Sequence, residues 1–526
     1  MERAPLSPRT RRWLLVAAVI LAVVGVAGAV MVNKAEPWAH AALTRALQER
    51  FDSEVTLESL DLSFLPRPSA EGTGLTLRYK GRRDLPPLIQ VGRFSAAGNW
   101  WSLPWRHVSD VTIEGLEISI PPGRGDEMPS MDGDSPADAD AARDAETPGG
   151  AFTIGHLGAS NARLSIMPKT AGKNPRVFDI FRLDMTDLDL DSASAFEATL
   201  TNPVPFGRIE TSGTFGPWAT AEPSATPVNG TFDFDADLGT IKGIAGALES
   251  NGRFGGPLSR IEASGSTHTP DFRIPKLNAA ALLLDTTFDA VIDGTEGDVA
   301  LTRVDATLGD SRITASGAVA GVDGVKGKRV VLDVTSDDAH IEDFLRLTVP
   351  VDPPLMTGAL TLDTDFDLPP GEADVIDRLL LDGRVRIATA RFTRESIQDK
   401  VDELSRRGRG RPEDEAIDDV ASDLDTTFTM GDGQLHLKQV TYQVSGAKVR
   451  MAGQYGLESK RMDFKGEALL NATVSETQKG FKHYLLKPFD PLFKRKGAGT
   501  RLALDVSGTV DDPKFGVAVG RTLFGK

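Results

Sequence analysis

Apolar and polar residues alternate along most of the chain in short runs, which is the pattern of β-strands with one face toward a core. Examples are residues 75–77, 232–235, 435–437 and 448–451. Gly, Pro, Asp and Asn separate the runs, as turn residues do. The pattern predicts a mainly β protein with about 25 strands, which side by side would form a long antiparallel sheet.

One stretch changes the phase of its alternation at Gly115. Its apolar residues are Val111, Ile113, Leu116, Ile118 and Ile120. A β-bulge at this glycine would turn both sets toward the inside of a bending sheet, because a bulge re-aims the strand that carries it. The same slip recurs between Leu437 and Val440.

A sheet with one apolar face needs a cover for that face. Few helical segments are available, which leaves two alternatives. The first is a second sheet, as in a packed β-sandwich. The second, which we predict, is a curled sheet whose groove shelters lipid acyl chains. Besides residues 111–120, its predicted lining residues are Phe232, Phe234, Leu435, Leu437, Val449 and Met451.

Two short helices interrupt the β pattern. The first begins near Pro37 and places Leu43, Leu47 and Phe51 on one face. The second covers residues 396–406, with Gly408 just beyond its end.

The segment Trp13–Val32 contains twenty residues without a charge. A helix of that length covers about 30 Å, the thickness of a bilayer core. Arginines in residues 1–12 predict that this tail stays in the cytoplasm. The alternative is a cleaved signal peptide ending near Ala27–Ala29, although signal cores are usually shorter. We predict a single-pass protein of the bacterial inner membrane with its body in the periplasm.

The formal net charge is −16, which disfavours nucleic acid as a partner because phosphate binding needs a basic surface. Cysteine is absent, so disulfides and Cys-based zinc or redox sites are excluded. Residues 124–150 are acidic and nearly free of large apolar residues, which predicts a disordered insertion.

No catalytic or metal-binding motif is recognisable. The seven histidines occur singly, without metal-ligand spacing. Asp233, Asp235 and Asp237 resemble a calcium loop, but the required glycine and glutamate positions hold Leu238 and Ile244. We therefore expect these aspartates to face water, and we predict a protein that is not an enzyme and has no cofactor. The remaining alternative, an envelope hydrolase, would need a cleft with a clustered acid, base and nucleophile.

A basic and aromatic segment follows Gly480. Its candidate membrane-contact residues are Phe481, Tyr484, Leu485, Lys487, Phe489, Phe493, Lys494 and Arg495. It has two interpretations: a cover for the end of the sheet, with lysines reaching outward, or an amphipathic element at a membrane or partner surface. Pro488 and Pro491 limit any helix here to about two or three turns.

Several segments resemble the AsmA-like family of bacterial envelope proteins, which is similar to the bridge-like lipid-transfer proteins. They are SEVTLESLDLSFLPRPSAEGTGLTLRY (residues 53–79), VTIEGLEISIPP (111–122), LTNPVPFGRIETSGTFGPW (200–218), GDGQLHLKQVTYQVSGAKVRMAGQYGL (431–457) and VSGTVDDPKFGV (506–517). The resemblance implies an inner-membrane anchor, an elongated curved sheet with an apolar groove, and a role in phospholipid movement to the outer membrane or in outer-membrane assembly.

These observations predict six segments: a cytoplasmic tail (1–12), an anchor (13–32), an N-terminal AsmA-like module (33–123), the acidic insertion (124–150), a β-groove body (151–395) and a C-terminal AsmA-like region (396–526). The expected function is to carry or conduct phospholipid for outer-membrane biogenesis. The alternative is an anchored scaffold that contacts an outer-membrane or envelope protein and assists outer-membrane protein assembly.

Overall fold

The computed structural model describes residues 39–49, 51–63, 67–99, 107–121, 153–167, 176–189, 191–294, 297–322, 325, 327–412, 422–472 and 501–518. The predicted anchor, the acidic insertion and the basic-aromatic segment lie outside these residues. Among the described residues, no helix combines the length and the apolar character that a membrane crossing needs.

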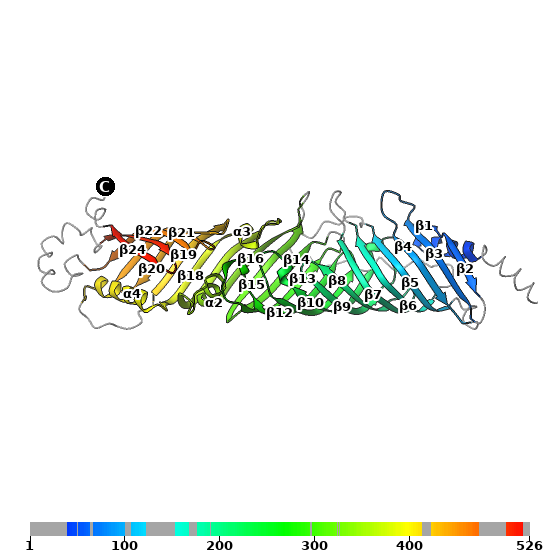
Figure 1. The fold of residues 1–526 in the computed structure, drawn as a ribbon, viewed down its shortest axis with the longest axis horizontal. Helices are drawn as coiled ribbons and strands as arrows, with labels where there is room; N and C mark the ends of the chain where they lie inside the picture. Colours follow the sequence, from blue (N-terminus) through cyan, green and yellow to red (C-terminus); the bar gives the residue numbers. More distant parts are fainter. Residues whose placement is uncertain are drawn as a thin grey trace, which may run out of the picture. The chain divides into compact units, whose positions relative to one another are not determined.

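The described chain is mainly β, and its 24 strands belong to one hydrogen-bonded sheet (Figure 1). The chain divides into two compact units. Strands β1–β7 belong to the first unit, and β12–β24 with helices α2–α4 belong to the second. Strands β8–β11 are divided between the units, so the body predicted over residues 151–395 contributes to both.

The first strands are β1 (Ser53–Thr56), β2 (Ser59–Ser63), β3 (Ser69–Tyr79), β4 (Ile89–Ala97), β5 (His107–Ile120), β6 (Thr153–Ile166), β7 (Arg176–Leu188), β8 (Ser194–Pro203), β9 (Phe206–Phe215), β10 (Pro227–Asp237) and β11 (Ala247–Pro257). Residues 39–49 form the predicted N-terminal helix. Leu47 of this helix packs on the buried cluster of Phe51, Val55, Leu77 and Leu88.

Strands β5 and β6 pair in parallel, which corrects the prediction of a wholly antiparallel sheet. Parallel neighbours need a crossover of a dozen or more residues. The chain between Ile120 and Thr153, which includes the acidic insertion, supplies that connection. The composition of the insertion gave no sign of this role, because strand direction depends on where a connection ends.

The predicted slip at Gly115 is present, but several strands share it. Gly115 has a left-handed φ of 67°, and so do Gly74 of β3 (66°) and Asn161 of β6 (52°). These residues lie at one level of the sheet, because the flanking pairs keep the same register from β3 to β6. The prediction of a β-bulge at Gly115 was therefore wrong. Strands β3 to β6 change the phase of their alternation at the same level, so β5 pairs with β4 without a register shift.

The second unit is an antiparallel meander in which each strand pairs with the next. Its strands are β12 (Ile261–Phe272), β13 (Leu282–Ile292), β14 (Val299–Leu308), β15 (Ser311–Gly321), β16 (Lys328–His340), β17 (Met356–Leu368), β18 (Leu380–Phe392), β19 (Ser422–Gly431), β20 (Gln434–Val444), β21 (Ala447–Gly456), β22 (Arg461–Leu470), β23 (Arg501–Thr509) and β24 (Pro513–Ala518).

Register shifts interrupt every pairing from β12–β13 to β20–β21. The shift between β20 and β21 falls between Leu437 and Val440, where the sequence predicts it. Each such irregularity increases the local bend and twist. The sheet of this unit is accordingly curled (Figure 1).

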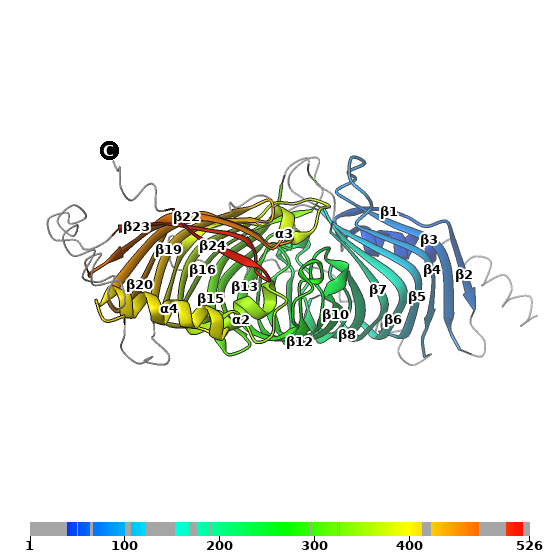
Figure 2. The same ribbon diagram turned by 60° about the vertical axis from the view of Figure 1, so that its left-hand side comes forward.

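Helices lie along the two long edges of the second unit, with α2 (Ile341–Thr348) and α4 (Glu395–Gly408) at one edge and α3 (Val375–Arg378) at the other (Figure 2). Helix α4 confirms the predicted helix and includes Gly408 as its last residue. Val401 of α4 packs with Val444, Ala447 and Leu470 of the sheet. The helices therefore cover margins of the apolar face, and the described residues contain no second sheet, so the sandwich alternative is wrong.

Candidate functional site

Two neighbouring rows cross the second unit, with one residue of each row on every strand from β13 to β23. They consist of apolar residues and glycines, with Thr364 as the polar exception. The first row is Ala290, Leu301, Gly317, Leu332, Phe366, Leu381, Met430, Leu435, Tyr455, Met462 and Gly508. The second row is Phe288, Val304, Ala315, Val334, Thr364, Gly383, Phe428, Leu437, Gly453, Phe464 and Val506. Most of these residues are only half-buried.

The residues between the two rows point to the other face and are polar. From β16 to β23 they are Asp333, Asp365, Asp382, Thr429, His436, Gln454, Asp463 and Ser507, each opposite the next. Because side chains of a strand alternate between faces, one face of this unit is apolar and the other is polar and mostly exposed.

The polar face is stabilised by pairs between arginine and aspartate. Arg384 of β18 donates from Nε and Nη2 to the two carboxylate oxygens of Asp425 on β19, at 3.0 and 2.6 Å. Hydrogen bonding to Arg384 is the main reason that the pKa of Asp425 lies below its usual range. A carboxylate whose pKa is lowered in the folded state stabilises the fold at pH values above its unfolded pKa of about 3.9. This stabilisation is lost as the pH falls through the folded pKa.

Replacing Arg384 by glutamine should therefore lower stability at neutral pH but have no effect in strong acid. Urea unfolding of wild type and Arg384→Gln should give different midpoints at pH 7 and converging midpoints below about pH 4. A difference that is the same at pH 7 and pH 3 would show that the pair does not act through the ionised carboxylate.

The apolar face of the first unit contains the predicted residues of the 111–120 stretch. Val111, Ile113 and Ile118 are half-buried, and Leu116 and Ile120 are buried, at 4% and 2% exposure. Ile113 pairs with Phe94 and Ala159, and Ile118 pairs with Ile89 and Leu164. Both halves of the stretch thus face the same side, as the sequence predicts, although Leu116 and Ile120 are core residues without an open surface.

Glycines on the apolar faces lie beneath aromatic rings of neighbouring strands. A Cβ atom at Gly453 would lie 2.5 Å from the ring of Phe464, and one at Gly72 would lie 2.4 Å from the ring of Phe94. The predicted lining residues Phe232 and Phe234 lie similarly against Gly252 and Gly207, at 2.8 and 2.7 Å. Because each ring rests on a position without a side chain, it lies close to the sheet.

The other predicted lining residues belong to the second unit. Leu435 and Leu437 lie in the first and second rows, and Met451 is half-buried beside them. Val449 is buried at 4% exposure. Asp233, Asp235 and Asp237 are exposed, as expected, and the described residues contain no cluster that could hold a metal ion.

A segment crosses from one long edge of the second unit to the other. Residues 273–281 follow β12, whereas Asp377 of α3 and Glu458 lie at the opposite edge, after β17 and β21. Lys276 Nζ is 2.8 Å from Asp377 Oδ1 and 3.2 Å from Glu458 Oε2. Leu277 belongs to one buried cluster with Met430 of the first row. A segment that joins both edges of a curled sheet while touching its apolar face runs across the concave side, so the apolar face is concave.

The first unit has a similar contact between its edges. Tyr79, at the end of β3, donates a hydrogen bond to the carbonyl of Ala221 at 2.6 Å, and Phe51 stacks edge-on against Trp218 at 5.8 Å. Ala221 and Trp218 belong to the connection between β9 and β10. Sequence patterns did not predict either crossing, because their partners are far apart in the chain.

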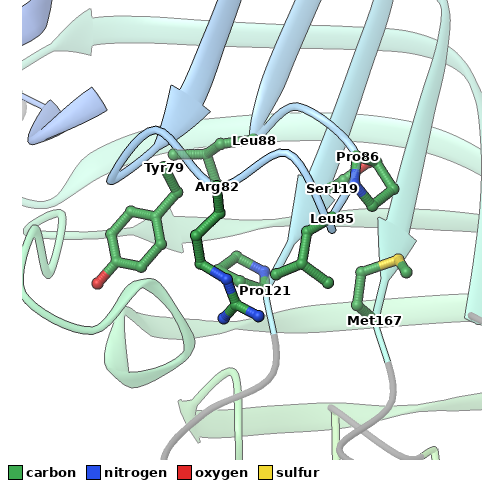
Figure 3. Close-up of a pocket in the computed structure, with 8 residues that line it drawn as sticks. All are labelled: Tyr79, Arg82, Leu85, Pro86, Leu88, Ser119, Pro121 and Met167. Atoms are coloured by element: carbon green, nitrogen blue, oxygen red, sulfur yellow. The ribbon is translucent and has the colours of Figure 1, made fainter. Parts of the chain in front are cut away.

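Two hollows lined by described residues are too small to hold a whole lipid. One cavity of about 10 Å³ has room for a single water molecule (Figure 3). It is lined by Tyr79, Arg82, Leu85, Pro86, Leu88, Ser119, Pro121 and Met167. A hollow of about 280 Å³ over β12–β14 brings Asp289, Arg303 and Asp305 beside Phe288. The concave apolar face is therefore the candidate functional site.

Comparisons with known proteins assign neither a family nor a function to the chain. No protein family model matches the chain, and no curated protein and no solved structure is significantly similar to it.

Proposed function

We propose that the protein carries lipid acyl chains along the concave apolar face of its curled sheet. The observation that supports this function is the pair of mainly apolar, half-buried rows from β13 to β23, with a largely polar opposite face. Monomeric soluble proteins rarely expose so continuous an apolar surface. An acyl chain lying on it gains about 0.8 kcal/mol for each methylene removed from water. No specific polar contact is required for such binding.

The proposed setting is the bacterial envelope. The uncharged segment Trp13–Val32 would anchor the chain in the inner membrane, with the sheet in the periplasm. The resemblance to AsmA-like proteins supports phospholipid as the cargo and the outer membrane as its destination. The absence of a recognisable catalytic motif agrees with a carrier that performs no chemistry.

Native mass spectrometry of the full chain, extracted from membranes without detergent, tests the proposal. We expect phospholipid to co-purify and to add discrete masses to the protein. Protein that is folded but free of lipid would contradict the carrier function.

The alternative function is an anchored scaffold for outer-membrane protein assembly. It is favoured by strand β24, which pairs only with β23 within the described residues and so offers an edge for an added strand. The same preparation distinguishes the two functions: an envelope protein that co-purifies in place of lipid would support the scaffold.

A further inference from the structure

Residues 273–281, which we call the cover, lie over part of the apolar face. Leu277 is 3% exposed and forms a buried cluster with Ile376, Met430 and Leu457. Leu381, Leu435 and Tyr455 of the first row pack against this cluster. The cover therefore occupies a stretch of the row where, under the proposed function, an acyl chain would lie.

Few polar contacts hold the cover to the opposite edge. The principal one is the ion pair of Lys276 with Asp377 and Glu458, at 2.8 and 3.2 Å. The side chains of Lys276 and Asp377 are 25% and 39% exposed, so water and salt weaken the attraction. A backbone hydrogen bond from Val375 N to Lys242 O, at 3.0 Å, ties the connection between β10 and β11 to the same edge and does not involve the cover.

The site beneath the cover contains an unsatisfied donor. The Tyr455 hydroxyl is buried and has no hydrogen-bond partner in the described part of the chain. A buried polar group without a partner costs free energy, and an added acceptor would remove that cost. The ester carbonyl of a phospholipid is such an acceptor, and it adjoins the acyl chain that would replace Leu277.

We propose that the cover masks an acyl-ester site formed by Leu381, Met430, Leu435 and Tyr455, and that release of Lys276 from Asp377 and Glu458 opens this site. The inference depends on the proposed function, since it concerns lipid on the same apolar face. Opening exchanges the contacts of Leu277 for those of a lipid chain and pairs the Tyr455 hydroxyl with the ester carbonyl.

Photoreactive methionine, incorporated at all ten methionines, tests the proposal in a single preparation. Met430 lies beneath the cover, whereas Met451 and Met462 are half-buried and belong to no covered cluster. The full chain is mixed with vesicles of phosphatidylethanolamine and phosphatidylglycerol and irradiated, and lipid adducts are mapped by peptide mass spectrometry.

Of Met430, Met451 and Met462, we expect the last two to carry most of the adducts in wild-type protein. Lys276→Gln should raise the ratio of Met430 to Met462 adducts about fivefold, because the cover loses its principal polar contact with the opposite edge. Arg303→Gln is the matched control, because it breaks an exposed pair with Asp305 that touches no part of the cover. This control should leave the ratio unchanged.

Two failures have different meanings. Adducts at Met451 and Met462 with a Met430 ratio that Lys276→Gln does not change would overturn the masked site and leave the carrier function standing. Adducts at none of the three methionines would overturn the carrier function itself.

A second variant tests the role of the hydroxyl separately from that of the ion pair. Tyr455→Phe removes an unpaired buried donor, so the fold should be unharmed. In the Lys276→Gln background it should lower Met430 labelling by ester phospholipid to the level seen with an ether-linked analogue. Equal labelling by ester and ether lipid before this substitution would exclude Tyr455 as the group that recognises the ester.

Discussion

Replacing Leu332 by aspartate should reduce lipid binding at least tenfold, whereas replacing its neighbour Val331 by aspartate should leave binding unchanged. Leu332 lies in the first apolar row, and Val331 is 43% exposed on the polar face of the same strand. A carboxylate against an acyl chain loses its hydration without gaining a partner, which costs several kcal/mol. A loss of about 1.4 kcal/mol already corresponds to a tenfold weaker affinity.

The two variants are matched in strand, substitution and net charge, so the comparison isolates the face of the sheet. Lipid content per protein, measured by native mass spectrometry, gives the result. Circular dichroism and thermal unfolding check that both variants fold; Leu332 is only half-buried, so its aspartate can still reach water in the empty protein. Equal loss of lipid in both variants would mean that the concave face is not the lipid-binding surface.

The substitution Asp343→Ala should destabilise the attachment of helix α2 by about 3 kcal/mol, as the loss of a buried and hydrogen-bonded charge commonly does. Asp343 is 1% exposed. Its carboxylate accepts hydrogen bonds from Asp310 N at 3.0 Å, Ser311 Oγ at 2.8 Å and Arg346 Nη1 at 3.2 Å. Alanine would leave the three donors without their acceptor and would open a void beside Gly309.

Asp343→Asn is the control for this prediction. The amide oxygen can keep the contacts with Asp310 and Ser311, and only the contact with Arg346 is lost, so about 1 kcal/mol is expected. Hydrogen exchange of the amides of α2 measures the local effect, because this helix can open separately from the sheet. Similar exchange rates in wild type and Asp343→Ala would show that the apolar contacts of Phe344 and Ile341 alone hold the helix.

The consequence for function is local. Helix α2 packs on a buried cluster of Ala339, Leu360, Ile387 and Ala390 at one margin of the apolar face. Loosening α2 should widen the accessible apolar surface at that margin without altering the rows of β19–β22. The substitutions of Leu332 and Asp343 therefore test separately the lining of the apolar face and the helix at its margin.

Local patterns in the sequence were sufficient to predict the strands and their two faces. Alternation placed Leu435 and Leu437 on the apolar face and His436 on the polar one, because side chains of a strand alternate regardless of what the strand pairs with. Helix α4 followed from its apolar spacing in the same way. The change of phase at Gly115 was also predictable from the sequence, because it follows from the alternating apolar residues on either side of this glycine.

Properties that depend on distant partners were not predictable. The parallel pairing of β5 with β6 depends on where a long connection returns, which composition does not encode. The rings of Phe94 and Phe464 rest on glycines of neighbouring strands, and only the pairing register brings each ring to its glycine. The burial of Val449, which we expected in an open groove, likewise comes from packing that the strand's own pattern does not contain.

The sequence by itself therefore determined a mainly β chain with one apolar and one polar face, because that information lies in residues one or two positions apart. Only the tertiary structure decided that the described strands belong to one hydrogen-bonded sheet, curled in the second unit, and that the described residues form no second sheet. Only it placed Lys276 against Asp377, a contact between residues 101 positions apart. Such contacts depend on the curl accumulated over many strands, so no local pattern can specify which edges meet.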